Sequence, residues 1–158
     1  MAHYPDRVKT KTTSSIIRIA AIIGLLDSLY LAYVKLAHTE IYCTPGLGDC
    51  DVVNASRWST LWGIPLGVYG VAGFGVILLI SLFGQKLKTL STYSDLVLFA
   101  LSLGGFLFSL YLTYIELFIL RAICQWCLLS ALMMTVIFIV SVYELVVKSA
   151  KSINSGGN

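Results

Sequence analysis

Four stretches of this chain are each long and apolar enough to cross a lipid bilayer as a helix. A helix needs about 20 consecutive apolar residues to span a hydrocarbon layer that is about 30 Å thick. The four stretches are residues 15–37, 64–83, 93–120 and 124–147. The first is too long for the core of a signal peptide, so we expect it to be a retained anchor. The sequence therefore predicts an all-α integral membrane protein, a four-transmembrane-helix bundle.

The amino-acid composition agrees with a membrane protein and argues against a soluble domain. Hydrophobic residues make up 58% of the chain and charged residues only 12%, against about 45–50% and about 25% in soluble domains. The formal net charge of +3 comes from basic residues that flank the apolar stretches and form no stripe. We therefore expect the lipid bilayer, and no nucleic acid, as a partner.

The positions of lysine and arginine predict the orientation, because these residues concentrate in cytoplasmic segments. Eight of the eleven precede or begin the first stretch, follow the second or follow the fourth: Arg7, Lys9, Lys11, Arg18, Lys86, Lys88, Lys148 and Lys151. We expect a multi-pass protein of the cell membrane with residues 1–14 and 148–158 in the cytoplasm and residues 152–158 frayed. Residues 15–147 then form one membrane domain, and its loop 38–63 is extracytoplasmic.

Four cysteines are predicted on the extracytoplasmic side, where disulfides persist. Cys43 and Cys50 lie in the loop 38–63, and Cys124 and Cys127 follow the short turn 121–123. One proline and two glycines lie between Cys43 and Cys50, and these residues favour turns. Residues 52–62 are predicted to form a short interfacial helix.

Two further positions at this end carry local predictions. Asn54 or Asp51 would cap the interfacial helix. Pro65 would occupy the first turn of the second span, where its missing N–H costs nothing.

Cys124 and Cys127 form a C-x-x-C motif at the start of a helix. Positions i and i+3 share a helix face, and a helix N-terminus lowers the pKa of a thiol. A plain disulfide or half of a zinc site would use the same motif. A four-thiolate zinc site is disfavoured, because six residues separate Cys43 from Cys50 where two to four are usual. No metal is expected.

The loop cysteines Cys43 and Cys50 also allow two interpretations. They could close the loop as a structural disulfide that contributes about 2–3 kcal/mol. Alternatively, one of them could attack the C-x-x-C disulfide as a thiolate and its neighbour could resolve the mixed disulfide. Two adjacent pairs on one side fit a relay better than a staple.

The order of these motifs resembles the vitamin K epoxide reductase family in its prokaryotic single-domain form. The resemblance rests on Cys43, residues 50–58 (CDVVNASRW), residues 63–65 (GIP) and the C-x-x-C at 124–127. The other quinone-linked four-span oxidases, of the disulfide bond formation protein B type, carry the two pairs in the reverse order. The order therefore favours the first family.

The resemblance implies a four-helix bundle around a quinone, capped by the loop helix. It also assigns roles to the cysteines: Cys127 faces the quinone, Cys124 exchanges with the loop, Cys50 attacks Cys124, and Cys43 meets the redox partner. Ser56 takes the position of the family's loop-helix serine, and Ser56, Leu66 and Ala131 are expected to line the quinone pocket.

The implied reaction is oxidation of protein dithiols coupled to reduction of a membrane quinone of the ubiquinone, menaquinone or vitamin K type. Such a reaction supports disulfide bond formation. This chain is expected to carry no fused thioredoxin-like domain, so its thioredoxin-like partner would be a separate protein.

At two positions the residue differs from the one found in the animal members of that family. Leu66 and Ala131 align with an asparagine and a tyrosine that hydrogen-bond quinone carbonyls, and neither can do so through its side chain. Epoxide reduction is therefore less expected than quinone reduction. Reduction of vitamin K quinone or its epoxide by the same cysteines, and a non-enzymatic scaffold with two structural disulfides, stay as alternatives.

Polar and aromatic residues within the spans complete the candidate site. Charged groups in a bilayer are costly and mark function by default, so Glu116 is a candidate for proton handling. Asp27 is a functional candidate of no assigned role, or else a protonated or hydrogen-bonded acid at a helix interface near Ser28 or Tyr30. Three residues have the right depth to line a quinone pocket, although core or interfacial packing explains them too: Trp58, Tyr69 and Leu120.

Overall fold

The computed structural model describes residues 4–46, 48–83 and 91–155. The long helices are α1 (Tyr4–Ala37), α3 (Leu66–Phe83), α4 (Ser91–Tyr114) and α5 (Gln125–Ser155). Between α1 and α3 lie the short helix α2 (Cys50–Ala55), the 3-10 helix η1 (Arg57–Ser59) and the strands β1 (Thr60–Leu61) and β2 (Ile64–Pro65). Helix α4 continues directly into the π-helix η2 (Ile115–Leu120).

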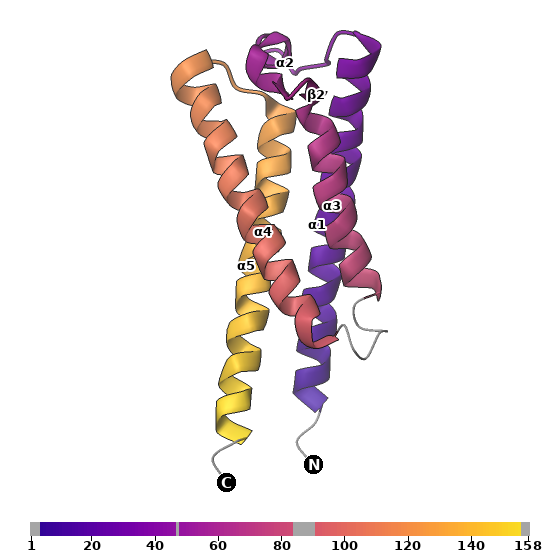
Figure 1. Cartoon of the computed structure of the whole chain (residues 1–158), viewed down its shortest axis with the longest axis vertical. Coiled ribbons are helices and arrows are strands. Elements are labelled where there is room, and N and C mark those ends of the chain that lie inside the picture. Colours follow the sequence, from indigo (N-terminus) through magenta and orange to yellow (C-terminus); the bar gives the residue numbers. More distant parts are fainter. Residues whose placement is uncertain (1–3, 47, 84–90, 156–158) are drawn as a thin grey trace.

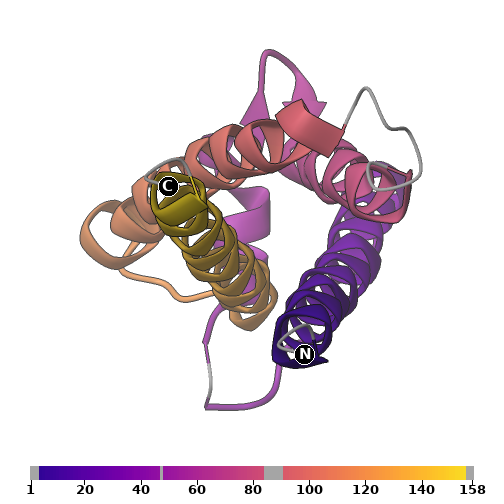
Figure 2. The same cartoon turned by 90° about the horizontal axis from the view of Figure 1, so that it is seen from below.

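The four long helices form a bundle, with α2 and β2 at one end and both termini at the other (Figure 1). Helix α1 packs along α3 and α5, and α5 also packs along α4, whereas α3 and α4 share fewer contacts (Figure 2). Four helical stretches are long and apolar enough to cross a membrane: Thr12–Ala37, Leu66–Phe83, Ser94–Leu120 and Gln125–Val147. The third runs from α4 into η2. The predicted all-α four-helix membrane bundle is confirmed.

Small residues let α1 and α3 approach closely. A Cβ atom added to Gly67 would lie 2.9 Å from the Cα atom of Ala32, and one added to Gly70 would meet the side chain of Ser28. Helix association in membranes depends on such close packing, since lipid chains are as apolar as leucine. The two helices therefore form a rigid wall of the bundle.

A buried apolar cluster fills the middle of the bundle, and apolar side chains also cover its outside. The cluster includes Ile17, Phe74 and Ile137. Leu26 on α1 and Ile139 on α5 are 62% and 59% exposed. Exposed leucine and isoleucine on a helix bundle are stable when the surrounding medium is lipid, so the surface agrees with a membrane environment.

Helices α1 and α5 extend beyond the predicted spans. Helix α1 begins at Tyr4, with Pro5 in its first turn, where a missing N–H costs nothing. Helix α5 continues to Ser155 because no helix breaker precedes Gly156. The prediction of a frayed tail is therefore wrong for residues 152–155, and residues 156–158 lie outside the described part. Lys86 and Lys88, two of the basic residues used to predict the orientation, also lie outside the described residues.

The loop helix differs from its predicted bounds of 52–62. Helix α2 begins at Cys50 and ends at Ala55, because Ser56 is extended with φ −65° and ψ 156°. Asp49 is the N-cap residue, so the expected caps at Asn54 and Asp51 are wrong. The Asp51 Oδ1 atom instead accepts a hydrogen bond from the N–H of Ile41 at 3.4 Å.

A two-stranded hairpin occupies the end of the predicted loop helix. Thr60 pairs with Pro65 and Leu61 with Ile64. The two turn residues, Trp62 and Gly63, both have positive φ, as a tight hairpin turn requires. Pro65 therefore belongs to β2 and immediately precedes α3, and its predicted place in the first turn of that helix is wrong.

Candidate functional site

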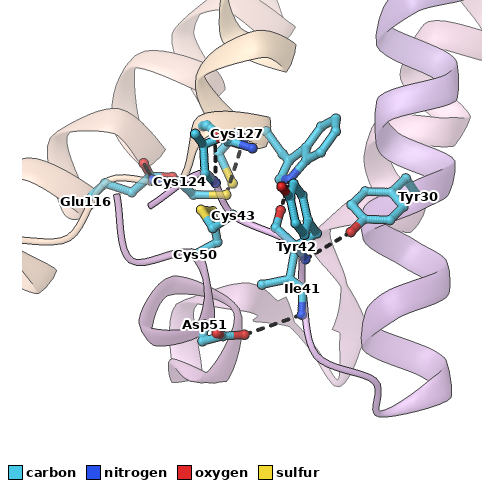
Figure 3. Close-up of a disulfide and its surroundings, with 12 residues drawn as sticks. Tyr30, Ile41, Tyr42, Cys43, Cys50, Asp51, Glu116, Cys124 and Cys127 are labelled. Carbon is cyan, nitrogen blue, oxygen red and sulfur yellow. Dashed lines mark hydrogen bonds between the residues drawn. A yellow bond between two sulfur atoms is a disulfide. The ribbon is translucent and has the colours of Figure 1, made fainter. Parts of the chain in front are cut away.

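All four cysteines meet at the end of the bundle opposite the termini. Cys43 and Cys50, the loop pair, form a disulfide with their Cα atoms 6.0 Å apart. Cys124 and Cys127, the helix pair, are free thiols. Cys50 and Cys124 are buried members of one cluster against which Cys43 and Cys127 pack (Figure 3). The structure thus brings the two pairs of the predicted relay together.

The helix pair lies at the N-terminus of α5. Cys124 immediately precedes the span Gln125–Val147, and its sulfur accepts a hydrogen bond from the N–H of Cys127 at 3.4 Å. This bond satisfies one of the N–H groups that a helix start leaves without an intrahelical partner. The first turn of the helix therefore holds the Cys124 sulfur in place.

The pKa of the Cys124 thiol is lowered by this arrangement. The main cause is a hydrogen bond from the side chain of Cys127, while burial and the charge of Glu116 act in the opposite direction. A lower pKa increases the thiolate fraction, and the thiolate is the form that exchanges disulfides. Cys124 thus has the environment of an exchanging cysteine.

Glu116 reaches the helix pair from η2. Its Oε2 atom accepts a hydrogen bond from the N–H of Cys124 at 3.2 Å, and the carboxylate also interacts with the Cys127 thiol. The π-helix ends at Leu120 and is capped by Arg121, which is left-handed with φ 50°. The N–H of Ala122 donates a hydrogen bond to the carbonyl of Glu116 at 3.1 Å. The predicted proton-handling residue therefore contacts the backbone of Cys124 and the thiol of Cys127.

The loop pair is tied to the helix pair by hydrogen bonds beside the cysteines. The N–H of Asp49 donates to the carbonyl of Ile123 at 3.0 Å. At the other loop cysteine, the indole N–H of Trp126 donates to the carbonyl of Tyr42 at 2.8 Å. Sequence patterns place Trp126 in an interfacial belt and give no sign of this contact.

Gly48 lies against the same segment. It has φ +149°, and a Cβ atom there would collide with the carbonyl group of Ile123. A residue without a side chain is therefore needed for this approach of the loop to α5.

A mainly apolar cavity of about 290 Å³ adjoins the helix pair. Its wall includes the Cys124 and Cys127 side chains and residues of the loop and all four long helices. It also includes every residue for which a quinone pocket or proton handling is predicted: Ser56, Trp58, Leu66, Tyr69, Glu116, Leu120 and Ala131. The volume approaches the lower bound of about 300 Å³ for ligand pockets. A planar quinone ring fits such a space by size and polarity.

Comparison with known proteins decides the family. The model of the vitamin K epoxide reductase family matches residues 15–142, which is most of the chain. The chain belongs to the vitamin K epoxide reductase family. The resemblance in cysteine order and loop sequence is thereby confirmed.

One relative of this family member has a function in its name. The chain is 35% identical over 57 residues to the thiol-disulfide oxidoreductase LTO1 of Arabidopsis thaliana. The match covers 36% of this chain and 15% of LTO1. The chain thus matches only a small part of that relative's length.

The cavity wall of this family member has its own polar groups. Leu66 and Ala131 offer no side-chain hydrogen bond, as predicted, but hydroxyl groups lie elsewhere in the wall. Ser109 and Thr113 of α4 are among them and are four residues apart, so they share a helix face. Neither residue was predicted from the sequence, although their i, i+4 spacing was visible there.

Loop residues of the wall are held by their own contacts. The Ser56 hydroxyl donates to the carbonyl of Val53 at 2.7 Å, and the Tyr69 hydroxyl donates to the carbonyl of Leu61 at 3.3 Å. The Arg57 guanidinium stands 4.9 Å from the centroid of the Trp58 ring. These contacts fix the loop side of the cavity.

Asp27 is hydrogen-bonded to a different residue than predicted. It is 4% exposed, and one carboxylate oxygen accepts a hydrogen bond from the hydroxyl of Ser130 on α5. The expected partners lie elsewhere, since Ser28 faces Gly70 and Tyr30 packs on Trp126. The prediction of an interface acid holds, but the interface is the one between α1 and α5.

No candidate metal site is present among residues 4–46, 48–83 and 91–155. There, no three His, Cys, Asp or Glu side chains lie close enough to hold an ion. Two of the four cysteines are bonded to each other, so four thiolates do not converge in this state.

Proposed function

We propose that this protein is a membrane thiol oxidoreductase that oxidises protein dithiols outside the cytoplasm and transfers their electrons to a membrane quinone. The observation that carries the proposal is the meeting of a loop disulfide and a helix dithiol beside a mainly apolar cavity. Family membership and the name of the relative LTO1 support the thiol-disulfide chemistry. Redox exchange at the loop would involve a separate thioredoxin-like protein.

The first exchange oxidises the partner protein. A partner thiolate attacks Cys43, the bond between Cys43 and Cys50 breaks, and the electron pair leaves on Cys50. The second partner thiolate then attacks its own mixed disulfide and releases Cys43. The partner has lost two electrons as a disulfide, and the loop pair has gained them.

The second exchange moves these electrons to the helix pair. The Cys50 thiolate attacks Cys124 of the oxidised helix pair, so a bond forms between Cys50 and Cys124, and Cys127 leaves as a thiolate. Cys43 then attacks Cys50 and releases Cys124. The products are a loop disulfide and a helix dithiol, the same pairing that the structure contains.

The cavity supplies the site for the final acceptor. A quinone contributes acceptance of two electrons and two protons, which is the chemistry that the side chains lack. Cys127 lies in the cavity wall, Glu116 exchanges protons with the helix pair, and the apolar wall excludes water. Ubiquinone, menaquinone and vitamin K types share the ring that this space would hold.

The orientation belongs to the same proposal. The basic residues favour cytoplasmic termini, and helix α2, which begins at Cys50, lies at the end of the bundle opposite the termini (Figure 1). The loop and helix pairs would then face the extracytoplasmic space, where their oxidation supports disulfide bond formation.

Anaerobic mixing of the fully reduced protein with ubiquinone and menaquinone analogues tests the function. We expect loss of protein thiols matched by formation of quinol, and no quinol from the Cys124→Ser, Cys127→Ser variant. Two structural disulfides would give no quinol from either protein. That outcome would exclude the proposed function in favour of the scaffold.

A trapping experiment tests the relay without a quinone. The Cys43→Ser, Cys127→Ser variant leaves only Cys50 and Cys124, and under mild oxidant these should form an intramolecular disulfide in most molecules. Mass spectrometry of proteolytic fragments would detect the linked peptides. Unlinked peptides, or intermolecular links alone, would show that the loop does not deliver Cys50 to the helix pair.

A further inference from the structure

The two residues inside the C-x-x-C motif both contact the segment around Cys43. The indole N–H of Trp126 donates to the carbonyl of Tyr42 at 2.8 Å, and the side-chain oxygen of Gln125 accepts from the N–H of Thr44 at 3.4 Å. Tyr42 and Thr44 are the two chain neighbours of Cys43. Gln125 and Trp126 thus bracket Cys43 through the backbone groups of its two neighbours, with no contact to a side chain of the loop required.

A third residue completes this bracket from α1. The Tyr30 hydroxyl accepts a hydrogen bond from the N–H of Tyr42 at 3.1 Å, and its ring packs on Trp126 with the centroids 4.8 Å apart (Figure 3). Both backbone polar groups of Tyr42 are therefore bound. The loop backbone at this point is held by hydrogen bonds on two sides.

The hydrogen bonds on both sides of Cys43 bear on which loop cysteine can exchange with Cys124. Cys50 and Cys124 are each 1% exposed and share a cluster, whereas Cys43 is only partly buried and follows Tyr42, which is 71% exposed. Held by both neighbours, Cys43 stays at the rim of the cluster while Cys50 lies inside it. Without the bracket, either loop cysteine could reach Cys124.

We propose that Gln125 and Trp126 are positioning residues that select Cys50 over Cys43 as the loop cysteine that exchanges with Cys124. The inference deepens the proposed function and rests on its relay. In the selected exchange the bond between Cys50 and Cys124 forms, the bond between Cys124 and Cys127 breaks, and the electron pair leaves on Cys127. In the wrong exchange Cys43 takes the place of Cys50, and the cysteine left to resolve it is the buried one.

The test measures which loop cysteine bonds to Cys124. In a Cys127→Ser parent, equilibrated in a glutathione buffer, three intramolecular disulfides compete, and mass spectrometry gives the ratio of the Cys50–Cys124 link to the Cys43–Cys124 link. Trp126→Phe keeps a ring beside Tyr30 but loses the N–H donor, and Gln125→Leu loses the acceptor. Since one hydrogen bond contributes about 0.5–1.5 kcal/mol, each change should lower the ratio by roughly 2- to 10-fold.

Three comparisons make the result specific. Gln125→Glu retains an acceptor and should restore most of the ratio lost in Gln125→Leu. Trp62→Phe alters a side chain that is 89% exposed and should leave the ratio unchanged. A ratio that is the same in Trp126→Phe, Gln125→Leu and the parent would overturn the inference while leaving the relay intact. If the parent forms neither link to Cys124, the relay itself fails and the inference fails with it.

Discussion

Gly48 offers the strongest test of whether the close approach of the loop to α5 keeps Cys124 buried. A methyl group at this position would collide with the carbonyl of Ile123, and Gly48 also has φ +149°, a conformation that L side chains rarely adopt. Gly48→Ala should therefore push the loop away from α5. The Cys124 side chain, which is 1% exposed with the loop in place, would then become accessible to reagents.

The size of the effect follows from two contributions. An alanine held in a sparsely populated backbone region costs about 1–3 kcal/mol. Loss of the hydrogen bond from Asp49 to Ile123 adds about 0.5–1.5 kcal/mol. A total of about 2–4 kcal/mol would raise the population of the displaced loop by roughly 30- to several-hundred-fold, at a factor of ten for each 1.4 kcal/mol.

The assay is the rate at which a small maleimide modifies Cys124 in purified protein, located by mass spectrometry. If opening is fast relative to modification, this rate follows the population of the displaced loop. Gly46→Ala is the matched control, because Gly46 also has positive φ, at 85°, but nothing lies within 4 Å of an added Cβ atom. We expect a much smaller increase there. Equal rates for the two variants, or no increase in Gly48→Ala, would refute the role assigned to the close approach.

Two further predictions concern the helix pair and the bundle. Cys127→Ala removes the side-chain hydrogen bond that is the main cause of the lowered Cys124 pKa, so that pKa should rise and the pH profile of Cys124 alkylation, measured with the loop pair reduced, should move to higher pH. A move to lower pH would contradict this assignment. Ser130→Ala leaves the buried Asp27 carboxylate without its donor and should destabilise the bundle by about 1–3 kcal/mol, detected as a lower thermal midpoint in detergent. Ser141→Ala is the control, since that buried hydroxyl has no partner among the described residues; equal midpoints for the two variants would rule out a stabilising bond.

The sequence was sufficient for the four spans because lipid imposes one strong requirement, a long apolar helix, that local composition reveals. It was also sufficient to expect the cysteines at one end, since two follow the first span and two follow the third, and these two spans end on the same side of the bundle. The residues predicted for the pocket lie in the cavity wall, and their role in quinone binding stays a prediction.

The loop was harder to predict because its conformation depends on tertiary contacts. Asp51 binds the backbone of Ile41 and does not cap α2, which no local pattern indicates. Trp126 and Gln125 have the expected positions on α5, but their hydrogen bonds join residues more than 80 positions apart. Likewise, only the packing of α1 on α5 places Ser130 beside Asp27.

The π-helix η2 makes the spacing between Glu116 and Cys124 intolerant of insertions and deletions. A π-helix contains one residue more than the α-helical pattern needs. Deleting a single residue such as Phe118 would remove this extra residue and shorten the connection between Glu116 and Cys124. The carboxylate of Glu116 would then leave the N–H of Cys124, although no residue in contact with either sulfur had been replaced. Chains of this type can therefore exchange many side chains along α4, whereas the number of residues in this connection is set by the geometry at its two ends.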